Sequence, residues 1–373
     1  MTVKIKRTTK IFLVVVMMAV TLVTLYLNRS VQTEAAEHED ELSYALRAPR
    51  DQVFEPVLPD SPVILPRDFA FQNKFQHGWW HFFANVKDRK GNEYGVQWSY
   101  FRVASNDSGM SGWLSPQLFI SHIVISSKDQ VWREQRVARG GIGQAGMTVQ
   151  PFKLWIDNWY WRSLGKTPFP GLLDVKTDEF AINLKTLTKG PFVIPGDRGY
   201  VPKHDLLPIA SHNLTSPFLE VRGELKLDNN KVVSVSGQGW MSKEWGSGLL
   251  AESQRGWDWF VVHLDNDMTM SLSRSRHDKQ LSYSFGTLSS NDGKVERLDD
   301  SEITIEPLNE IVLKNGKRVP LKWSIKVPKH GIDVTAQALN SDIWLPFIIP
   351  YGEGPIKTTG THHAVGFMQL TGY

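Results

Sequence analysis

The chain has 373 residues, and none of them is cysteine. This absence excludes disulfide bridges, thiolate catalysis, cysteine-ligated zinc sites and a lipid-modified N-terminal cysteine. A broadly basic body is also lacking, although the formal net charge is +3, because residues 1–36 carry five basic side chains and one acidic one. That segment contributes +4 and leaves −1 for the rest of the chain. No nucleic-acid partner is therefore expected.

Long stretches of helical periodicity are scarce, whereas the chain contains 29 glycines, 20 prolines and 11% aromatic residues. This balance favours an all-β protein. The 41% hydrophobic and 22% charged residues are typical of a globular chain and argue against a disordered or multi-span membrane protein. The length is sufficient for two domains.

One long apolar run is present, at residues 11–27, and four basic residues precede it. This order is typical of a targeting segment, and two interpretations stay open. Residues 11–27 either remain as an anchor in the inner membrane or belong to a signal peptide that is cleaved near residues 33–35. In both cases residues 1–36 direct the body to the periplasmic, extracytoplasmic side. An acidic and proline-punctuated spacer follows at residues 37–66.

The remaining sequence alternates apolar and polar residues over short segments. In residues 94–100 tyrosine, valine and tryptophan occupy every second position, and residues 219–227 alternate in the same way before a turn at residues 228–230. Short strands with turn residues between them predict antiparallel barrels or sandwiches. Because the pattern occurs in both halves, we expect one β domain at residues 67–247 and a second at residues 248–373.

Two motifs suggest cofactor or metal chemistry but lack the necessary context. Residues 141–146 match the Gly-x-Gly-x-x-Gly dinucleotide fingerprint, yet Pro151 and β-branched residues follow where a helix is required. We interpret this segment as a glycine-rich turn. His77 and His81 lie four residues apart, so a strand places them on one face, but no third metal ligand lies at a suitable spacing. No cofactor and no metal ion are expected.

Four aromatic-rich segments stand out, at residues 76–83, 239–246, 256–260 and 370–373. Tryptophan buries a large area and its N–H needs a partner, so clustered tryptophans are typical of the boundary between a core and a pocket. We expect these segments to form an apolar pocket that holds a few polar groups and binds a small molecule. The candidate ligand-contacting residues are Trp79, Trp80, His81, Trp98, Trp240, Trp245, Trp257, Trp259 and Tyr373.

Four polar residues within this aromatic and apolar sequence are candidate acid–base catalysts: Asp258, Glu244, His122 and Glu353. An apolar pocket raises the pKa of a carboxyl group, which can then donate a proton near neutral pH. The alternative is that these side chains satisfy buried tryptophan N–H and backbone groups. Strand alternation sends Asp258 to the face opposite Trp257 and Trp259, so a pocket contains either the aspartate or the tryptophans unless a β-bulge intervenes. Glu353 lies in a glycine- and proline-rich stretch that we expect to be a loop.

At these segments the chain resembles the AttH/carotenoid-hydratase (CrtC-type) family, whose members are often labelled secreted hydrolases. The shared motifs are Trp-Trp followed by a strand that ends in Phe-Arg, Trp-Met-x-x-Glu-Trp-Gly at residues 240–246, Gly-Trp-Asp-Trp-Phe at residues 256–260 and the terminal Leu-Thr-Gly-Tyr. The resemblance implies two lipocalin-like antiparallel β-barrels. It also implies an exported protein, often encoded near ABC transporter genes, with relatives that hydrate isoprenoid or prenylated compounds.

Three departures from the family pattern concern catalysis: Ser242 and Lys243 replace an Asp-His pair, His81 replaces a tyrosine, and Gln369 replaces a glutamate. Loss of the Asp-His pair removes a natural proton donor and its orienting partner. We therefore favour a membrane-associated protein that binds an apolar ligand, such as a lipid or isoprenoid, as an accessory of ABC permease subunits. The alternative is a hydratase that protonates a carbon–carbon double bond, stabilises the cation on tryptophan faces and adds water.

Overall fold

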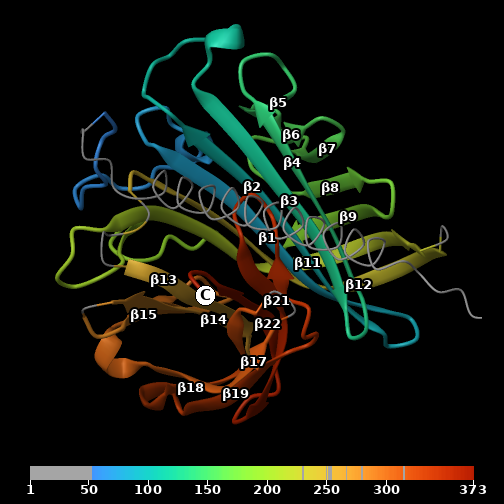
Figure 1. The fold of residues 1–373 in the computed structure, drawn as a ribbon, viewed down its shortest axis with the longest axis vertical. Helices are drawn as coiled ribbons and strands as arrows, with labels where there is room; N and C mark the ends of the chain where they lie inside the picture. The colour runs from blue at the N-terminus through green and yellow to red at the C-terminus, as the bar shows by residue number, and fades with distance from the viewer. Residues whose placement is uncertain are drawn as a thin grey trace, which may run out of the picture. The chain divides into compact units, whose positions relative to one another are not determined.

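The computed structural model describes residues 53–228, 231–248, 250, 254–265, 267–278, 280–313 and 316–373. These residues form β-strands and short 3-10 turns, and none of them forms an α-helix (Figure 1). The all-β class expected from the sequence is confirmed. Within this part of the chain no helix is long and apolar enough to cross a membrane. The targeting segment expected at residues 1–36 lies outside the described residues.

The first sheet has the strand order β4-β3-β2-β1-β12-β11-β9-β8-β7-β6-β5, and β10 pairs with β11. Its strands are β1 (His77–Asp88), β2 (Glu93–Ala104), β3 (Gln117–Ser127), β4 (Val131–Arg139), β5 (Ala145–Val149), β6 (Phe152–Ile156), β7 (Trp159–Ser163), β8 (Gly171–Lys176), β9 (Ala181–Thr188), β10 (Tyr200–Pro202), β11 (Ala210–Leu227) and β12 (Lys231–Gly246). The Tyr100 hydroxyl on β2 donates to the carbonyl oxygens of Gly146 (2.9 Å) and Trp155 (2.6 Å) on β5 and β6. The two ends of the sheet therefore approach each other, and the sheet curls into a barrel. Two 3-10 turns accompany it, η1 (Arg67–Phe69) and η2 (Gly112–Leu114).

The second sheet has the order β16-β15-β14-β13-β22-β21-β19-β18-β17, with β20 paired to β21. Its strands are β13 (Gln254–His263), β14 (Met268–His277), β15 (Tyr283–Ser290), β16 (Val295–Leu298), β17 (Thr304–Val312), β18 (Arg318–Val327), β19 (Ile332–Ala338), β20 (Trp344–Leu345), β21 (Tyr351–Gly360) and β22 (Val365–Leu370), with the 3-10 turns η4 (Asp300–Glu302) and η5 (Pro328–His330). Every strand pair is antiparallel, and this sheet also curls into a barrel. Both sheets belong to one compact unit.

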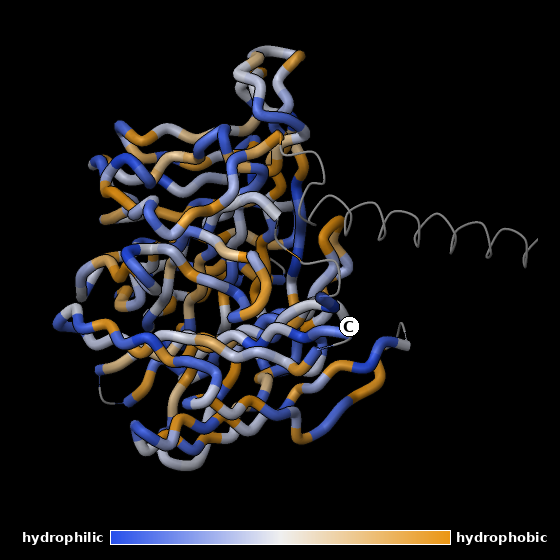
Figure 2. The backbone as a smooth tube through the Cα atoms, turned by 90° about the vertical axis from the view of Figure 1, so that its left-hand side faces the viewer, coloured by the Kyte–Doolittle hydropathy of each residue, from blue (hydrophilic) through white to orange (hydrophobic). Residues whose placement is uncertain are grey.

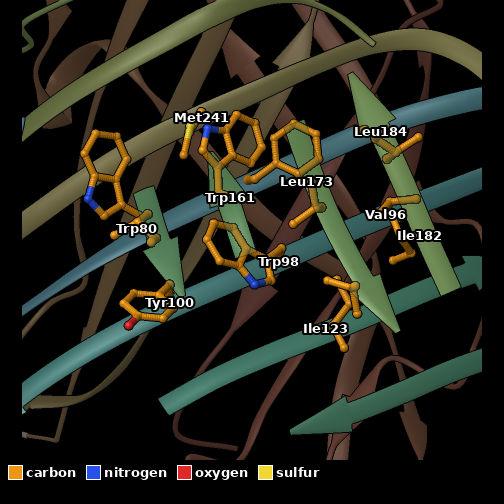
Figure 3. Packing of buried hydrophobic residues seen from close by; sticks show 14 of the residues in the cluster. Trp80, Val96, Trp98, Tyr100, Ile123, Trp161, Leu173, Ile182, Leu184 and Met241 are labelled. Carbon is orange, nitrogen blue, oxygen red and sulfur yellow. The ribbon is translucent and has the colours of Figure 1, made fainter. Parts of the chain in front are cut away.

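Each barrel is filled by its own side chains. Hydrophilic and hydrophobic residues alternate along the strands (Figure 2), and the apolar ones enter the barrel interiors. In the first barrel Trp98 and Trp161 stack with ring centroids 6.0 Å apart, close to Trp80 (Figure 3). In the second barrel Phe260 packs against Trp323 at 5.1 Å. Apolar side chains from the strands therefore occupy the interiors of both barrels.

Strand β1 is apolar on both faces because each face is covered. Its even-numbered residues, such as Trp80 and Phe82, belong to the core of the first barrel. Its odd-numbered residues point to the second sheet, where the Phe83 ring stacks on Phe367 at 4.6 Å and approaches Trp259 at 5.5 Å. The outer face of the first barrel thus packs against the second barrel through a separate aromatic cluster.

The structure differs from one expectation at this junction. The glycine- and proline-rich stretch around Glu353 is the beginning of strand β21 rather than a loop. A small residue on the facing strand allows the two sheets to pack closely here, because a Cβ at Gly95 on β2 would lie 2.6 Å from the Pro355 side chain. The turn interpretation is confirmed for residues 141–144, since Gly141 and Gly143 both have φ of 85° between β4 and β5, whereas Ala145 and Gly146 begin β5.

Candidate functional site

A cavity of about 100 Å³ lies at the junction of the two sheets. The first barrel contributes residues of β1, β10, β11 and β12, and the second contributes residues of β13, β14, β15, β16 and β22. Five aromatic side chains line it: Trp79, Trp240, Trp257, Trp259 and Phe285. Both barrels supply rings to this wall, so the site exists only where the two are packed together.

A row of hydroxyl groups lies on the second sheet beside these rings. Alternate residues of a strand share a face, so Ser271, Ser273 and Ser275 of β14 all line the cavity. The indole N–H of Trp259 donates to Ser271 Oγ at 2.9 Å, and that of Trp257 donates to Gln369 Oε1 at 2.9 Å. These bonds fix the orientation of both indoles at the cavity wall.

A charged pair, Lys203 and Glu244, lies among the residues that line the cavity. Lys203 Nζ lies 2.6 Å from Glu244 Oε1, and both side chains are mostly buried. Asn213 Nδ2 is 3.5 Å from the other carboxylate oxygen of Glu244, and Lys203 Nζ lies 5.4 Å from the centroid of the Phe285 ring. Charge-assisted contacts of this kind orient the polar end of a bound molecule.

A buried histidine–carboxylate pair lies at the wall of the cavity. His81 lines the cavity, and its Nε2 lies 2.8 Å from Ser99 Oγ and 3.1 Å from Glu353 Oε1. The Gln97 amide donates to Glu353 Oε2 at 2.6 Å, and the Gln369 amide donates to Glu353 Oε1 at 3.2 Å. Each Glu353 oxygen thus has a partner, and the carboxylate holds the His81 ring in one orientation. Strands of both sheets build this network.

His122 and Tyr351 extend the polar network beyond the residues that line the cavity. His122 Nδ1 lies 2.9 Å from the Tyr351 hydroxyl, and both side chains are buried. Burial lowers the pKa of His122 to about 3, and nearby His81 adds to this effect. Burial and the neighbouring Glu353 raise the pKa of Tyr351 well above its usual value. Both groups are therefore neutral near neutral pH.

Asp258 lies on the face of β13 opposite the cavity. Its Oδ1 accepts a hydrogen bond from the Tyr373 hydroxyl at 2.7 Å, and its Oδ2 lies 3.2 Å from Arg276 Nε and 3.9 Å from an Arg274 nitrogen. Burial raises the pKa of this carboxyl group, and the two arginines partly oppose the shift. Of the two arrangements that strand alternation allows, the structure places the tryptophan pair at the cavity.

The structure thus separates the candidate residues into three places. Those at the cavity are Trp79, His81, Trp240, Glu244, Trp257 and Trp259, and Glu353 contacts His81 from the second sheet. Those in the core of the first barrel are Trp80, Trp98 and Trp245. Those elsewhere are His122 in the adjoining network and Asp258 with Tyr373 on the opposite face of β13.

Sequence reasoning did not select several residues that build the site. Gln97, Ser99 and Lys203 are single polar residues, and no local pattern distinguishes them from ordinary strand residues. The serine row did have a signal, because serine recurs at every second position of residues 271–275. In the described part of the chain no group of three histidine, aspartate or glutamate side chains is placed to hold a metal ion.

The fold and the site define a class of protein in which two packed antiparallel β-barrels form an aromatic cavity at their junction. A family model described as AttH-like matches residues 56–373, and the chain therefore belongs to the AttH-like family. A search among curated proteins finds no match to the sequence.

Solved structures share this fold. The chain is similar to an AttH protein from Nitrosomonas europaea, with 22% identity and a TM-score of 0.76 over 86% of this chain and 99% of that chain. It is also similar to kievitone hydratase from Nectria haematococca, with 13% identity and a TM-score of 0.62 over 87% of this chain and 98% of that chain. At these identities the similarity establishes the common architecture.

Proposed function

We propose that the protein binds an apolar small molecule, of lipid or isoprenoid type and with at least one polar group, in the cavity between the barrels. The observation that carries the proposal is the convergence of five aromatic rings from both sheets on one cavity. The Lys203–Glu244 pair and the serine row of β14 add polar partners beside the rings. Apolar walls with a few placed polar groups are the usual composition of a small-molecule site.

Binding must widen the cavity. Its volume of about 100 Å³ holds a few water molecules, whereas sites for drug-sized ligands have roughly 300–1,000 Å³. The rings of Trp79, Trp240 and Trp259 therefore have to move apart when a ligand enters. Covering about 300 Å² of apolar ligand surface would contribute roughly 7 kcal/mol before the cost of this rearrangement. Tryptophan fluorescence should consequently report the binding event.

Native mass spectrometry of the full chain tests the proposal. The protein is delipidated, exposed to a membrane lipid extract and examined for retained molecules. Wild type should retain a ligand, and Trp259→Ala should lose it because the variant removes one aromatic wall. Trp155→Ala is the matched control, since Trp155 lies on β6 outside the cavity. A wild-type chain that retains nothing, or equal retention by all three proteins, would contradict the proposal.

We infer in addition that this binding takes place on the extracytoplasmic side, at the inner membrane. The basic and apolar order of residues 1–27 supports this location, and the family resemblance supports an accessory role beside ABC permease subunits. Fractionation of cells and affinity purification of the full chain test both statements. A purely cytosolic chain refutes the location, and purification without permease subunits refutes the accessory role.

The His81–Glu353 pair favours a second candidate function, the acid-catalysed addition of water to a carbon–carbon double bond. Glu353 and Ser99 occupy Nε2 of His81, and Nδ1 has no hydrogen bond within the described part of the chain. In this mechanism protonated His81 transfers its proton to one alkene carbon, and the rings of Trp79 and Trp259 stabilise the cation at the other carbon. Water then adds to the cation and returns a proton to His81, so the net change is addition of one water molecule.

Replacement of Glu353 separates the two functions. Glu353→Gln keeps the size of the side chain but removes the carboxylate that holds His81. If the protein is a hydratase, turnover of isoprenoid alkenes should fall by orders of magnitude while ligand retention stays near the wild-type level. Incorporation of oxygen from isotopically labelled water provides the assay. A wild-type protein that binds the alkene and incorporates no labelled oxygen would refute catalysis and leave the binding function in place.

A further inference from the structure

One exposed apolar surface lies apart from the cavity, on the connection between β2 and β3. Residues 105–116 form this connection and include η2. Three of their side chains are exposed: Met110 by 49%, Trp113 by 74% and Leu114 by 72%. The chain has 14 tryptophans, all among the described residues, and Trp113 is the one that is exposed. The connection projects beyond the strands of the first sheet (the short teal helix in Figure 1).

Hydrogen bonds hold the backbone of this connection in place, while three of its apolar side chains are exposed. Its two ends are joined by a hydrogen bond from the Ser105 N–H to the Pro116 carbonyl oxygen at 3.1 Å. The guanidinium of Arg139 on β4 donates to the Trp113 carbonyl oxygen at 2.9 Å. Exposed apolar groups that cluster on an ordered projection indicate a surface that contacts something else. We call Met110, Trp113 and Leu114 the apolar tip.

The chain enters the body at the same end of the first sheet. The Glu55 N–H donates to the Lys74 carbonyl oxygen at 2.9 Å, so the beginning of the described chain runs beside residue 74. Two residues later, the Gln76 carbonyl oxygen accepts a hydrogen bond of 2.8 Å from the N–H of Ala104, which immediately precedes the connection. The entry point of the chain therefore lies beside the segment that leads into β1, and that segment is hydrogen-bonded to the base of the apolar tip at the end of β2.

The sequence upstream of this entry point contains the apolar run expected to enter a membrane. Residues 28–52 separate that run from the described chain, and a segment of this length reaches at most about 90 Å when fully extended. In the anchor interpretation of residues 11–27, the sheet end that carries the apolar tip is tied within this distance of the bilayer. Tryptophan prefers the interfacial layer of a membrane, and leucine and methionine prefer its hydrocarbon.

We propose that the apolar tip inserts into the membrane to which the N-terminal segment directs the protein, and docks the body on the bilayer surface. The cavity lies toward the same end of the sheet, because Trp79 at its wall pairs with Phe101, three residues before Ala104. Docking through the tip brings the cavity mouth near the source of an apolar ligand. The proposal rests on the expected targeting segment and is independent of catalysis.

The absence of cysteine allows a direct test with the full chain. A single cysteine introduced as Leu114→Cys carries a polarity-sensitive fluorophore, and the protein is reconstituted in vesicles that contain spin-labelled lipids. Leu281→Cys is the matched control, because Leu281 is 90% exposed between β14 and β15. The label at position 114 should show a blue-shifted emission and several-fold stronger quenching by the lipid spin labels than the label at position 281.

Each other outcome overturns the proposal. Equal and weak quenching at both positions places the tip in water. A blue shift at position 114 without lipid quenching means that protein covers the tip, either a second copy or a partner. Met110→Cys provides an independent second site if Leu114→Cys does not fold. Adding Trp113→Ser to either labelled chain should reduce the quenching, and unchanged quenching would contradict the role of the tip. Failure of ligand capture alone leaves this result unaffected.

Discussion

Replacement of Lys243 by methionine should abolish a pH dependence of stability that the wild-type protein shows. Lys243 is fully buried in the first barrel, and its ammonium group donates to the carbonyl oxygens of Asp68 and Ala70, each at 2.6 Å. It also lies 4.0 Å from the centroid of the Trp245 ring. Burial lowers the pKa of this lysine from 10.5 to about 7, against the opposing charge of Asp68.

The sign of the effect follows from proton linkage. Between about pH 7 and 10.5 the lysine is protonated in the unfolded chain and largely neutral in the folded one. Stability rises with pH wherever the unfolded state binds more protons. One group contributes about 1.4 kcal/mol per pH unit in this window, or on the order of 5 kcal/mol across all of it. Below pH 7 both states bind the proton, and the contribution of Lys243 no longer changes.

Chemical denaturation followed by tryptophan fluorescence, at several pH values across the window, measures the effect. Lys243→Met removes the titrating group and leaves two carbonyl oxygens without their donor, which is a constant cost at every pH. The stability difference between wild type and variant should therefore grow steadily in favour of wild type as pH rises. Lys326→Met, at a half-exposed lysine on β18, should retain the wild-type slope. Identical slopes in wild type and Lys243→Met would refute the reasoning.

Two further predictions concern acid stability and the junction. Burial lowers the pKa of His122 to about 3 and that of His263 to about 4, so the unfolded chain gains protons before the folded one and stability should fall as pH drops from 6.5 toward 4. Thermal unfolding across this range checks it, and a constant midpoint would contradict it. Gly95→Ala should lower stability by roughly 1–3 kcal/mol because its Cβ would lie 2.6 Å from the Pro355 side chain. Denaturation with Gly109→Ala as control, where the Cβ meets nothing within 4 Å, measures this difference, and equal stabilities would contradict it.

Alternation in the sequence predicts antiparallel strands in barrels or sandwiches, and the family resemblance selects barrels, but neither assigns each strand face. Trp79 and Trp80 are neighbours in an apolar run, and the sequence marks both as pocket candidates. The structure sends Trp80 into the first barrel and Trp79 to the junction. A strand covered on both sides has two apolar faces, so its residue pattern does not distinguish a barrel core from a barrel-to-barrel contact.

The sequence marks His81 and Glu353 as separate candidate residues, but it does not show that their side chains contact each other. His81 and Glu353 meet only because β1 of the first barrel packs against β21 of the second. Ser242, where the family resemblance implies an aspartate, pairs directly with His81 on the neighbouring strand. Lys243, where the resemblance implies a histidine, points into the barrel core. The chain lacks the Asp-His motif at residues 242–243, but its His81–Glu353 pair lies beside Ser242.

The last prediction concerns Asp258, because strand alternation alone places its side chain on the face of β13 away from the cavity. The irregularity in the pairing of β13 with β14 lies between Gln254 and Gly256, before Trp257, so the alternation at residues 257–259 is undisturbed. Asp258→Asn keeps the shape of the side chain and removes the charge that faces Arg276 and Tyr373. We expect a stability loss of roughly 1–3 kcal/mol, since a buried charged hydrogen bond is lost.

Ligand retention by Asp258→Asn should match that of wild type, because the carboxylate lies on the face of the strand away from the cavity. Denaturation and native mass spectrometry on the same sample measure both quantities. Gln369→Leu is the complementary variant, since it removes the acceptor of the Trp257 indole N–H at the cavity wall and should weaken retention. Unchanged stability together with lost retention in Asp258→Asn would place the aspartate in the site and refute the strand-face assignment of β13.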